Sequence, residues 1–135
     1  MPSDEISEPI KTFLFERIHS HEELEVVVLL GREAAQPWTE ETIARVLKID
    51  VSLIRDALNA LRNRDIVEAL AETTTITWRI GQIHNPQSSE LVALYDQHRL
   101  EIVMLMSANA IERVRTGAMR TFADCFFLGK QRGDG

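Results

Sequence analysis

The sequence is poor in several features that mark common protein classes. It holds one cysteine, Cys125, so no disulfide can form within the chain. No uninterrupted apolar run is longer than IVMLM at residues 102–106, which is far shorter than the roughly 20 residues that span a bilayer. The opening residues MPSDEISEPIK lack the basic start and apolar stretch of a secretory signal. We therefore expect a cytoplasmic protein with no membrane partner.

Motifs of common enzymes are also missing from the sequence. It contains no G-x-S-x-G, no glycine-rich phosphate loop and no H-E-x-x-H. His19 and His21 lie close together, but no set of cysteines or carboxylates at zinc-binding spacing accompanies them. We predict a protein that is not an enzyme, with no catalytic residue, no metal site and no cofactor.

Positive charge is scarce. The chain has 15 lysines and arginines against 21 acidic residues, a formal net charge of −6 and a pI near 5.2. Such a balance is unusual for a protein that neutralises phosphates. The hydrophobic content of 44% over 135 residues is enough for one core with an appended element.

The clearest pattern in the sequence runs from Thr39 to Ala69 and predicts helix, turn, helix and strand. Thr39 suits a helix N-cap, and Glu40 and Glu41 follow it in the first turn. Lys48-Ile49-Asp50 forms the turn. The second helix carries one apolar stripe, made by Val51, Ile54, Ala57, Leu58 and Leu61.

The flanking segments predict further elements. Residues 1–19 fit either a helix or a strand, and we favour a helix. Ser20-His21-Glu22-Glu23 has the form of a capping box and predicts a helix start, with Gly31 near its end. The β-compatible runs 66–70 and 75–80 predict a hairpin whose tip is 71–74.

After the hairpin, residues 81–89 (GQIHNPQSS) predict a linker, because Asn-Pro breaks regular structure. Residues 90–128 predict helical structure with a possible kink at Thr116-Gly117, and residues 129–135 a tail. One apolar face of this segment needs cover, from the same chain or from a second copy, and we favour a homodimer. The predicted dimerisation residues are Leu91, Leu94, Tyr95, His98, Ile102 and Leu105.

Residues 20–80 resemble the winged helix-turn-helix superfamily of bacterial regulators, including its MarR-like and GntR-like groups. Lys48 and Asp65 depart from the family pattern, which commonly has glycine at both positions. The resemblance implies a mainly α fold with a small β-hairpin, in which this domain is preceded by an extension at 1–19 and followed by C-terminal helices. The matching residues are Thr39, Ile43, Ala44, Leu47, Ile49, Ile54, Ala57, Leu58, Leu61, Ile66 and Val67.

The resemblance also implies that the second helix of the motif enters the major groove of double-stranded DNA. Segment 39–64 carries a net charge of +1 and the hairpin 65–80 carries −2, so the helix pair suits phosphates better than the hairpin does. We expect a DNA-binding transcription regulator that acts as a homodimer; the alternative is an acidic module that binds a protein partner. The predicted groove-facing residues are Ser52, Arg55, Asn59 and Arg62, with Arg45 and Lys48 on backbone phosphates.

Overall fold

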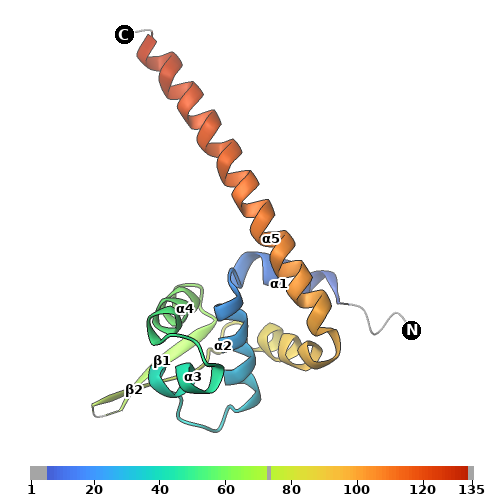
Figure 1. Cartoon of the computed structure of the whole chain (residues 1–135), viewed down its shortest axis with the longest axis vertical. Coiled ribbons are helices and arrows are strands. Elements are labelled where there is room, and N and C mark those ends of the chain that lie inside the picture. Colours follow the sequence, from blue (N-terminus) through green and yellow to red (C-terminus); the bar gives the residue numbers. More distant parts are fainter. Residues whose placement is uncertain (1–5, 73, 134–135) are drawn as a thin grey trace.

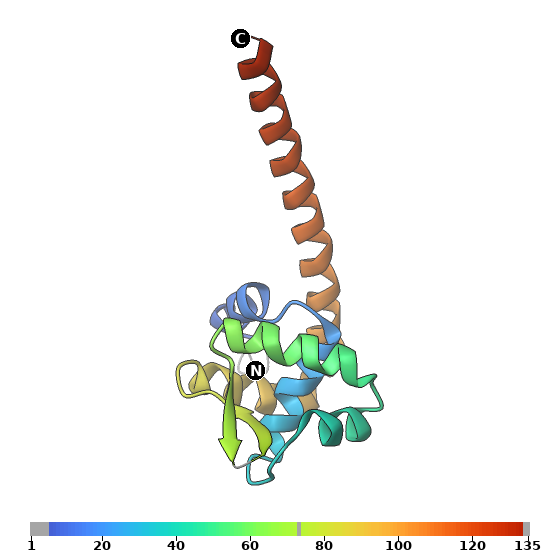
Figure 2. The same cartoon turned by 90° about the vertical axis from the view of Figure 1, so that its left-hand side faces the viewer.

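The computed structural model describes residues 6–72 and 74–133. In that part of the chain, four helices are followed by a two-stranded antiparallel hairpin and one long helix (Figure 1). Most elements form one body, and the far part of α5 projects from it as an arm (Figures 1 and 2). The elements are α1 (Glu8–Arg17), α2 (His21–Arg32), α3 (Glu40–Leu47), α4 (Val51–Asn63), β1 (Val67–Glu72), β2 (Thr75–Ile80) and α5 (Asn85–Gly133).

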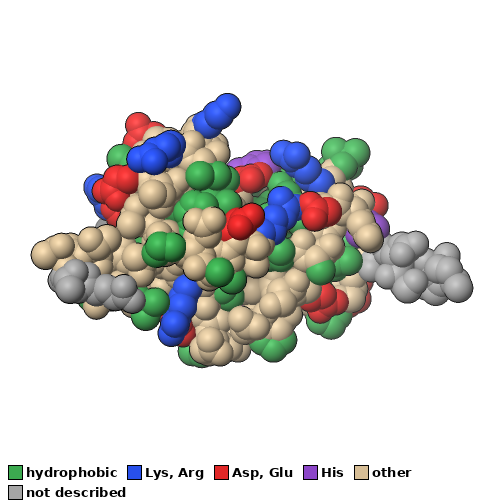
Figure 3. Space-filling view, turned by 90° about the horizontal axis from the view of Figure 1, so that it is seen from below, with side chains coloured by type: hydrophobic (Ala, Val, Ile, Leu, Met, Phe, Trp, Pro, Cys, Tyr) green, Lys and Arg blue, Asp and Glu red, His purple; other side chains and the backbone are tan. Residues whose placement is uncertain are grey.

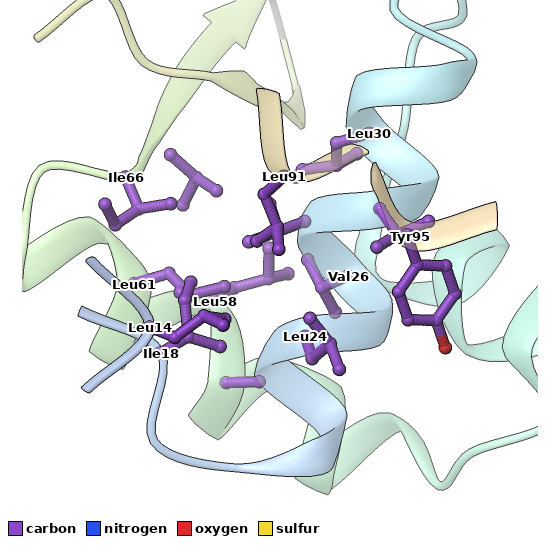
Figure 4. Close-up of a cluster of buried hydrophobic side chains, with 14 of the residues drawn as sticks. Leu14, Ile18, Leu24, Val26, Leu30, Leu58, Leu61, Ile66, Leu91 and Tyr95 are labelled. Carbon is purple, nitrogen blue, oxygen red and sulfur yellow. The ribbon is translucent and has the colours of Figure 1, made fainter. Parts of the chain in front are cut away.

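Helix α2 lies at the centre of the body and packs against α3, α4, α5 and β2. Its apolar residues are buried on almost every side, which fits a helix that is covered all round. The close-up in Figure 4 shows side chains of α2, α4 and α5 gathered in one cluster. The buried residues of α2 are Glu23, Leu24, Val26, Val27, Val28 and Leu30.

Gly31 allows α5 to approach α2 closely. A Cβ atom at this position would lie 2.5 Å from a methyl carbon of Val92, a distance that real side chains do not tolerate. We expected Gly31 near the C-cap, but α2 continues through Arg32, so the glycine serves helix packing and not helix termination.

The joint between α1 and α2 is held by charged side chains from distant elements. Ser20 caps α2 by accepting from the Glu23 backbone N–H, and the buried Glu23 carboxylate accepts from the His19 N–H at 2.8 Å. Arg64, just after α4, forms an ion pair with Glu23 and donates to the Arg17 carbonyl at 3.1 Å. The α1 prediction and the Ser20 cap are thereby confirmed.

Arg113 of α5 reaches the same joint. Its guanidinium donates to the carbonyls of Phe15 and Ile18 at 3.3 Å and of His19 at 3.5 Å. These carbonyls belong to the end of α1, where helical acceptors have no partner within the helix. Arg64 and Arg113, which we call the joint arginines, therefore tie α1 to both α4 and α5.

The hairpin forms as predicted, but β1 runs from Val67 to Glu72, into the expected tip 71–74, because Ala71 and Glu72 pair with Ile76 and Thr75. Val67 pairs with Ile80 and Glu72 with Thr75, and a further bridge joins Trp38 to Trp78. Asp65, which precedes β1, has a φ of 63°, in the left-handed region that glycine tolerates best. The family's preference for glycine at this position therefore reflects a backbone requirement that Asp65 also meets.

Helix α5 corrects three sequence predictions. It begins at Asn85, inside the expected linker 81–89, because proline is tolerated in the first turn of a helix. The break in helical geometry falls at His98 (φ −125°, ψ 32°) and not at Thr116-Gly117. The helix also continues to Gly133, through most of the expected tail 129–135.

The face predicted to dimerise lies in the chain's own core. Leu91 and Ile102 are fully buried and Tyr95 nearly so, while Leu94 and Leu105 pack against them and His98 is half-buried. The Tyr95 hydroxyl donates to Glu25 of α2 at 2.8 Å, and burial together with this carboxylate raises the pKa of Tyr95. This face of residues 90–106 thus completes the body formed by α1 to β2, and a second copy would meet a different face of α5.

Candidate nucleic-acid interface

Local hydrogen bonds build the α3–turn–α4 unit. Thr39 and Thr42 form a reciprocal capping box at the start of α3. Lys48 ends α3 with a φ of 58°, again left-handed where the family commonly has glycine. Asp50 caps α4 by accepting from the Ser52 N–H at 2.8 Å. The chain direction therefore reverses within three residues, and α4 starts in a fixed orientation.

Ser52 is exposed, as predicted, but its hydroxyl is used by the cap. It donates to the Asp50 carboxylate at 2.7 Å, and the hydrogen bonds from the Ser52 hydroxyl and N–H lower the pKa of Asp50. The Ser52 oxygen can still accept a hydrogen bond from a ligand, while its proton is committed to Asp50.

Arg55 lies on the outer face of α4 and braces it against α3. Its Nε donates to the Glu40 carboxylate at 3.1 Å, and about half of its side chain stays exposed. The pair offsets part of the positive charge that Arg55 would offer to a phosphate. It also holds the guanidinium in one orientation.

Arg62 lies seven residues after Arg55, two turns further along α4. Its guanidinium lies over the Trp78 ring of β2, with 5.9 Å from Cζ to the ring centroid. Asn59 is exposed between the two arginines. Arg55, Asn59 and Arg62, which we call the α4 outer row, form one line of hydrogen-bonding side chains along the helix.

Arg45 and Lys48 are exposed near the end of α3, as predicted for residues that contact phosphates. Sequence reasoning missed two exposed apolar side chains of the same unit, Val46 (53% exposed) and Leu53 (47%). Both lie outside the buried apolar stripes of their helices, and this position in the sequence pattern could have identified them as exposed. Apolar groups at such positions can contact a thymine methyl or a protein surface.

One acidic side chain of the hairpin, Glu68, is already paired within the protein. Glu68 accepts from Arg79 at 3.0 Å and from the Gln82 N–H at 3.1 Å, and the Gln82 N–H, followed by Arg79, lowers the pKa of the Glu68 carboxyl. Thr74, Thr75 and Ile76 are exposed near the tip. The carboxylate of Glu68 is therefore paired at the side of the hairpin instead of facing an incoming phosphate unpaired.

Figure 3 shows the face of the body that points away from the arm. Lysine and arginine side chains are separated there by acidic and apolar ones and form no single basic patch. Among the described residues no group of three or more histidine, cysteine or acidic side chains could hold a metal ion. None of the helices over the described ranges is both long and apolar enough to cross a bilayer.

No protein-family model and no curated protein matches the sequence. Solved structures do match. MepR, a transcription regulator of the Staphylococcus aureus multidrug efflux pump MepA, matches with a TM-score of 0.55 and 11% identity, over 87% of this chain and 88% of MepR. The adhesin competence repressor AdcR from Streptococcus pyogenes gives 0.53 and 18%, over 82% of each chain. The chain has the winged helix-turn-helix fold.

A point mutant of Lactococcus lactis ZitR is also similar, with a TM-score of 0.52 and 18% identity over 81% of this chain and 76% of that one. In terms of this fold, α3 and α4 are the helix-turn-helix and the β1–β2 hairpin is the wing. The resemblance inferred from residues 20–80 is confirmed at the level of fold, and the match extends into α5.

Proposed function

We propose that this protein binds double-stranded DNA as a homodimer, places α4 in the major groove and regulates transcription in the cytoplasm. The solved structures with the same fold include a transcription regulator, MepR, and a repressor, AdcR. At sequence identities of 11–18%, the similarity of the structures supports the fold only. A role for this chain is therefore argued from its own residues.

The observation that carries the proposal is the α4 outer row. Arg55, Asn59 and Arg62 are exposed along one face of a helix whose opposite face is fully buried. Arginine donates two parallel hydrogen bonds to guanine, and asparagine forms a matching pair with adenine. Arg45 and Lys48 at the end of α3 add positive charges for the phosphate backbone.

A second candidate is a protein partner that binds the same unit. The exposed Val46 and Leu53, the Arg55–Glu40 pair and the net charge of −6 favour it. A protein surface gains from apolar contacts and tolerates an acidic neighbour, whereas a phosphate backbone is repelled by carboxylates.

Titration of the protein with a mixed-sequence pool of duplex DNA, followed by fluorescence anisotropy, distinguishes the two candidates. We expect binding that weakens steeply between about 50 and 200 mM salt, because counterions are released from the phosphates. The double variant Arg55→Ala/Arg62→Ala is expected to lose about 30-fold or more in affinity.

The matched control is Lys11→Ala/Arg99→Ala, which removes the same two charges from α1 and α5. It should keep its affinity within about threefold, because only remote electrostatics change. Absence of binding by the wild-type protein at low salt would overturn the DNA proposal in favour of the protein partner. Equal losses in both double variants would show non-specific charge attraction and would overturn the assignment to α4.

A further inference from the structure

The arm of α5 has two different sides. One side packs on the body through Ile102 (fully buried), Met106 (4% exposed) and the joint arginine Arg113. Nearly opposite, four large apolar side chains are exposed, and we call them the arm stripe: Leu100 (73%), Met104 (63%), Ile111 (69%) and Val114 (73%). Their spacing of four, seven and three residues keeps them on one face of the helix.

The arm stripe is symmetric about its own middle. Counted from the point between Ser107 and Ala108, Met104 and Ile111 are equally distant, and Leu100 and Val114 match within one residue. The residues at the middle are small and exposed. Two such helices that run in opposite directions would therefore set large side chains against large ones, and small residues at the centre would let the backbones approach.

The charges beside the stripe have the same symmetry with opposite signs. Glu101 and Arg115 are both exposed on one border of it, and they too are equally distant from the middle within one residue. In an antiparallel pair the two-fold axis places each Glu101 near Arg115 of the other copy. In a parallel pair the axis carries the second copy's charges to the opposite border and leaves them four turns apart, so that these pairs do not form.

We infer that the occupant of the arm stripe is a second copy of this chain, bound antiparallel with the two-fold axis close to Ser107 and Ala108. The inference rests on the homodimer of the proposed function and specifies its contact surface and direction. A stripe whose apolar and charged residues become complementary under a two-fold rotation fits an identical helix better than an unrelated partner. The residues predicted from sequence, such as Leu91 and Ile102, stabilise the body that carries the arm.

The first test measures oligomeric mass by sedimentation equilibrium, without DNA, so that its outcome is independent of the DNA-binding proposal. We expect a wild-type dimer. Met104→Asp and Ile111→Asp should each weaken it by about 100-fold or more, because a carboxylate would be buried between apolar side chains. Thermal unfolding checks that each variant is folded. A wild-type monomer at high concentration, or dimers unaffected by both changes, would overturn the inference.

A charge exchange tests the direction of the two helices. Glu101→Arg and Arg115→Glu should each weaken the dimer about fivefold, since two attractive pairs per dimer become repulsive. The double variant should regain wild-type affinity. Glu101 also lies 3.3 Å from His98 of its own chain, and loss of that contact alone would not be rescued by a change at Arg115. Glu112→Arg is the control: no charged residue lies at its symmetry-related position, so this change should not alter the affinity of the dimer.

Disulfide trapping in a Cys125→Ser background gives a direct readout. A mixture of Leu100→Cys and Val114→Cys chains should form a mixed disulfide dimer, whereas neither variant alone should cross-link efficiently. Met104→Cys mixed with Ile111→Cys should do the same. Efficient self-cross-linking of Leu100→Cys and of Val114→Cys would indicate a parallel pair and overturn the inference.

Discussion

Four arginines of this protein form two sets that sequence alone does not separate. The joint arginines, Arg64 and Arg113, are half-buried and donate to backbone carbonyls at the end of α1. The arginines of the α4 outer row, Arg55 and Arg62, are exposed and contact one neighbour each. The same guanidinium group thus fixes the relative positions of three helices in one place and lies exposed at the surface in the other.

The difference shows where positive charge is available in an acidic chain. Arg62 and Arg64 are two residues apart, yet the first lies exposed over Trp78 and the second turns into the joint. Counting both in the charge of segment 39–64 overstates the positive charge that the segment exposes. The useful count is the α4 outer row together with Arg45 and Lys48.

The largest expected effect comes from Arg64→Met. It removes the ion-pair partner of the buried Glu23 carboxylate and a donor to the Arg17 carbonyl, and we expect a loss of about 3 kcal/mol in the free energy of unfolding. Urea denaturation measures it. Arg62→Met, the same change two residues earlier, should cost less than about 1 kcal/mol. Equal losses in the two variants would contradict the division into two sets.

Arg113→Met tests the second joint arginine. The end of α1 would lose the donor to three carbonyls, partly replaced by water, so we expect about 1.5 kcal/mol of destabilisation. The control Arg115→Met changes the exposed neighbour two residues on and should be neutral for the isolated chain. Protection of α1 amides in hydrogen exchange should also fall in Arg113→Met, and unchanged protection would count against the proposed tie.

Lys48 belongs to the exposed set but carries a backbone cost. Its φ of 58° is strained for any residue with a Cβ, so Lys48→Gly should stabilise the protein by about 1 kcal/mol. Lys48→Ala removes the charge and keeps the strain. In thermal unfolding, a difference of about 1 kcal/mol between the glycine and alanine variants measures the backbone contribution. Equal melting temperatures of the two variants would show that the turn is not strained.

Arg55→Ala/Arg62→Ala should lower the free energy of unfolding by less than about 1 kcal/mol in total. One exposed ion pair and one cation–π contact are lost, and each contributes little in water. The circular dichroism melt of this double variant should stay close to that of the wild type. A loss as large as that of Arg64→Met would place these arginines in the structural set.

The smallest expected effect appears only as the pH falls. Burial, and then the positive charges of Arg64 and Arg113, lower the pKa of His19 below its usual value of 6.5. The unfolded chain therefore binds a proton more readily than the folded one, and stability declines as the pH drops below 6.5. His19→Asn should have a flatter dependence of melting temperature between about pH 7.5 and 5.5, and His21→Asn, an exposed control, should behave as the wild type.

The local elements of the fold could be predicted because short-range signals determine them. Thr39, Asp50 and Ser20 cap their helices through neighbours two or three residues away, and the apolar stripe of α4 has one period throughout. The two left-handed positions were also visible, as departures from glycine at Lys48 and Asp65. The α4 outer row could be located because it is what the stripe leaves outside.

The part that escaped prediction depends on contacts between distant segments. The buried face of α5 and the exposed arm stripe are both apolar at helical spacing, and only the place of α1 and α2 in space decides which is covered. Glu23 and Arg64 are 41 residues apart, so nothing local marks them as partners. The kink at His98 has no proline or glycine beside it, so the local sequence does not predict it.

The burial of Leu91, Tyr95 and Ile102 beneath α2 has a consequence for how the protein is made. A ribosome that has released only residues 1–80 has delivered the helix-turn-helix and the wing, but not the helix that covers one side of α2. The nascent helix-turn-helix unit therefore keeps apolar surface exposed until α5 emerges. A chain that stops before residue 106 should be degraded or held by chaperones, so that only chains with the complete body and its arm would accumulate.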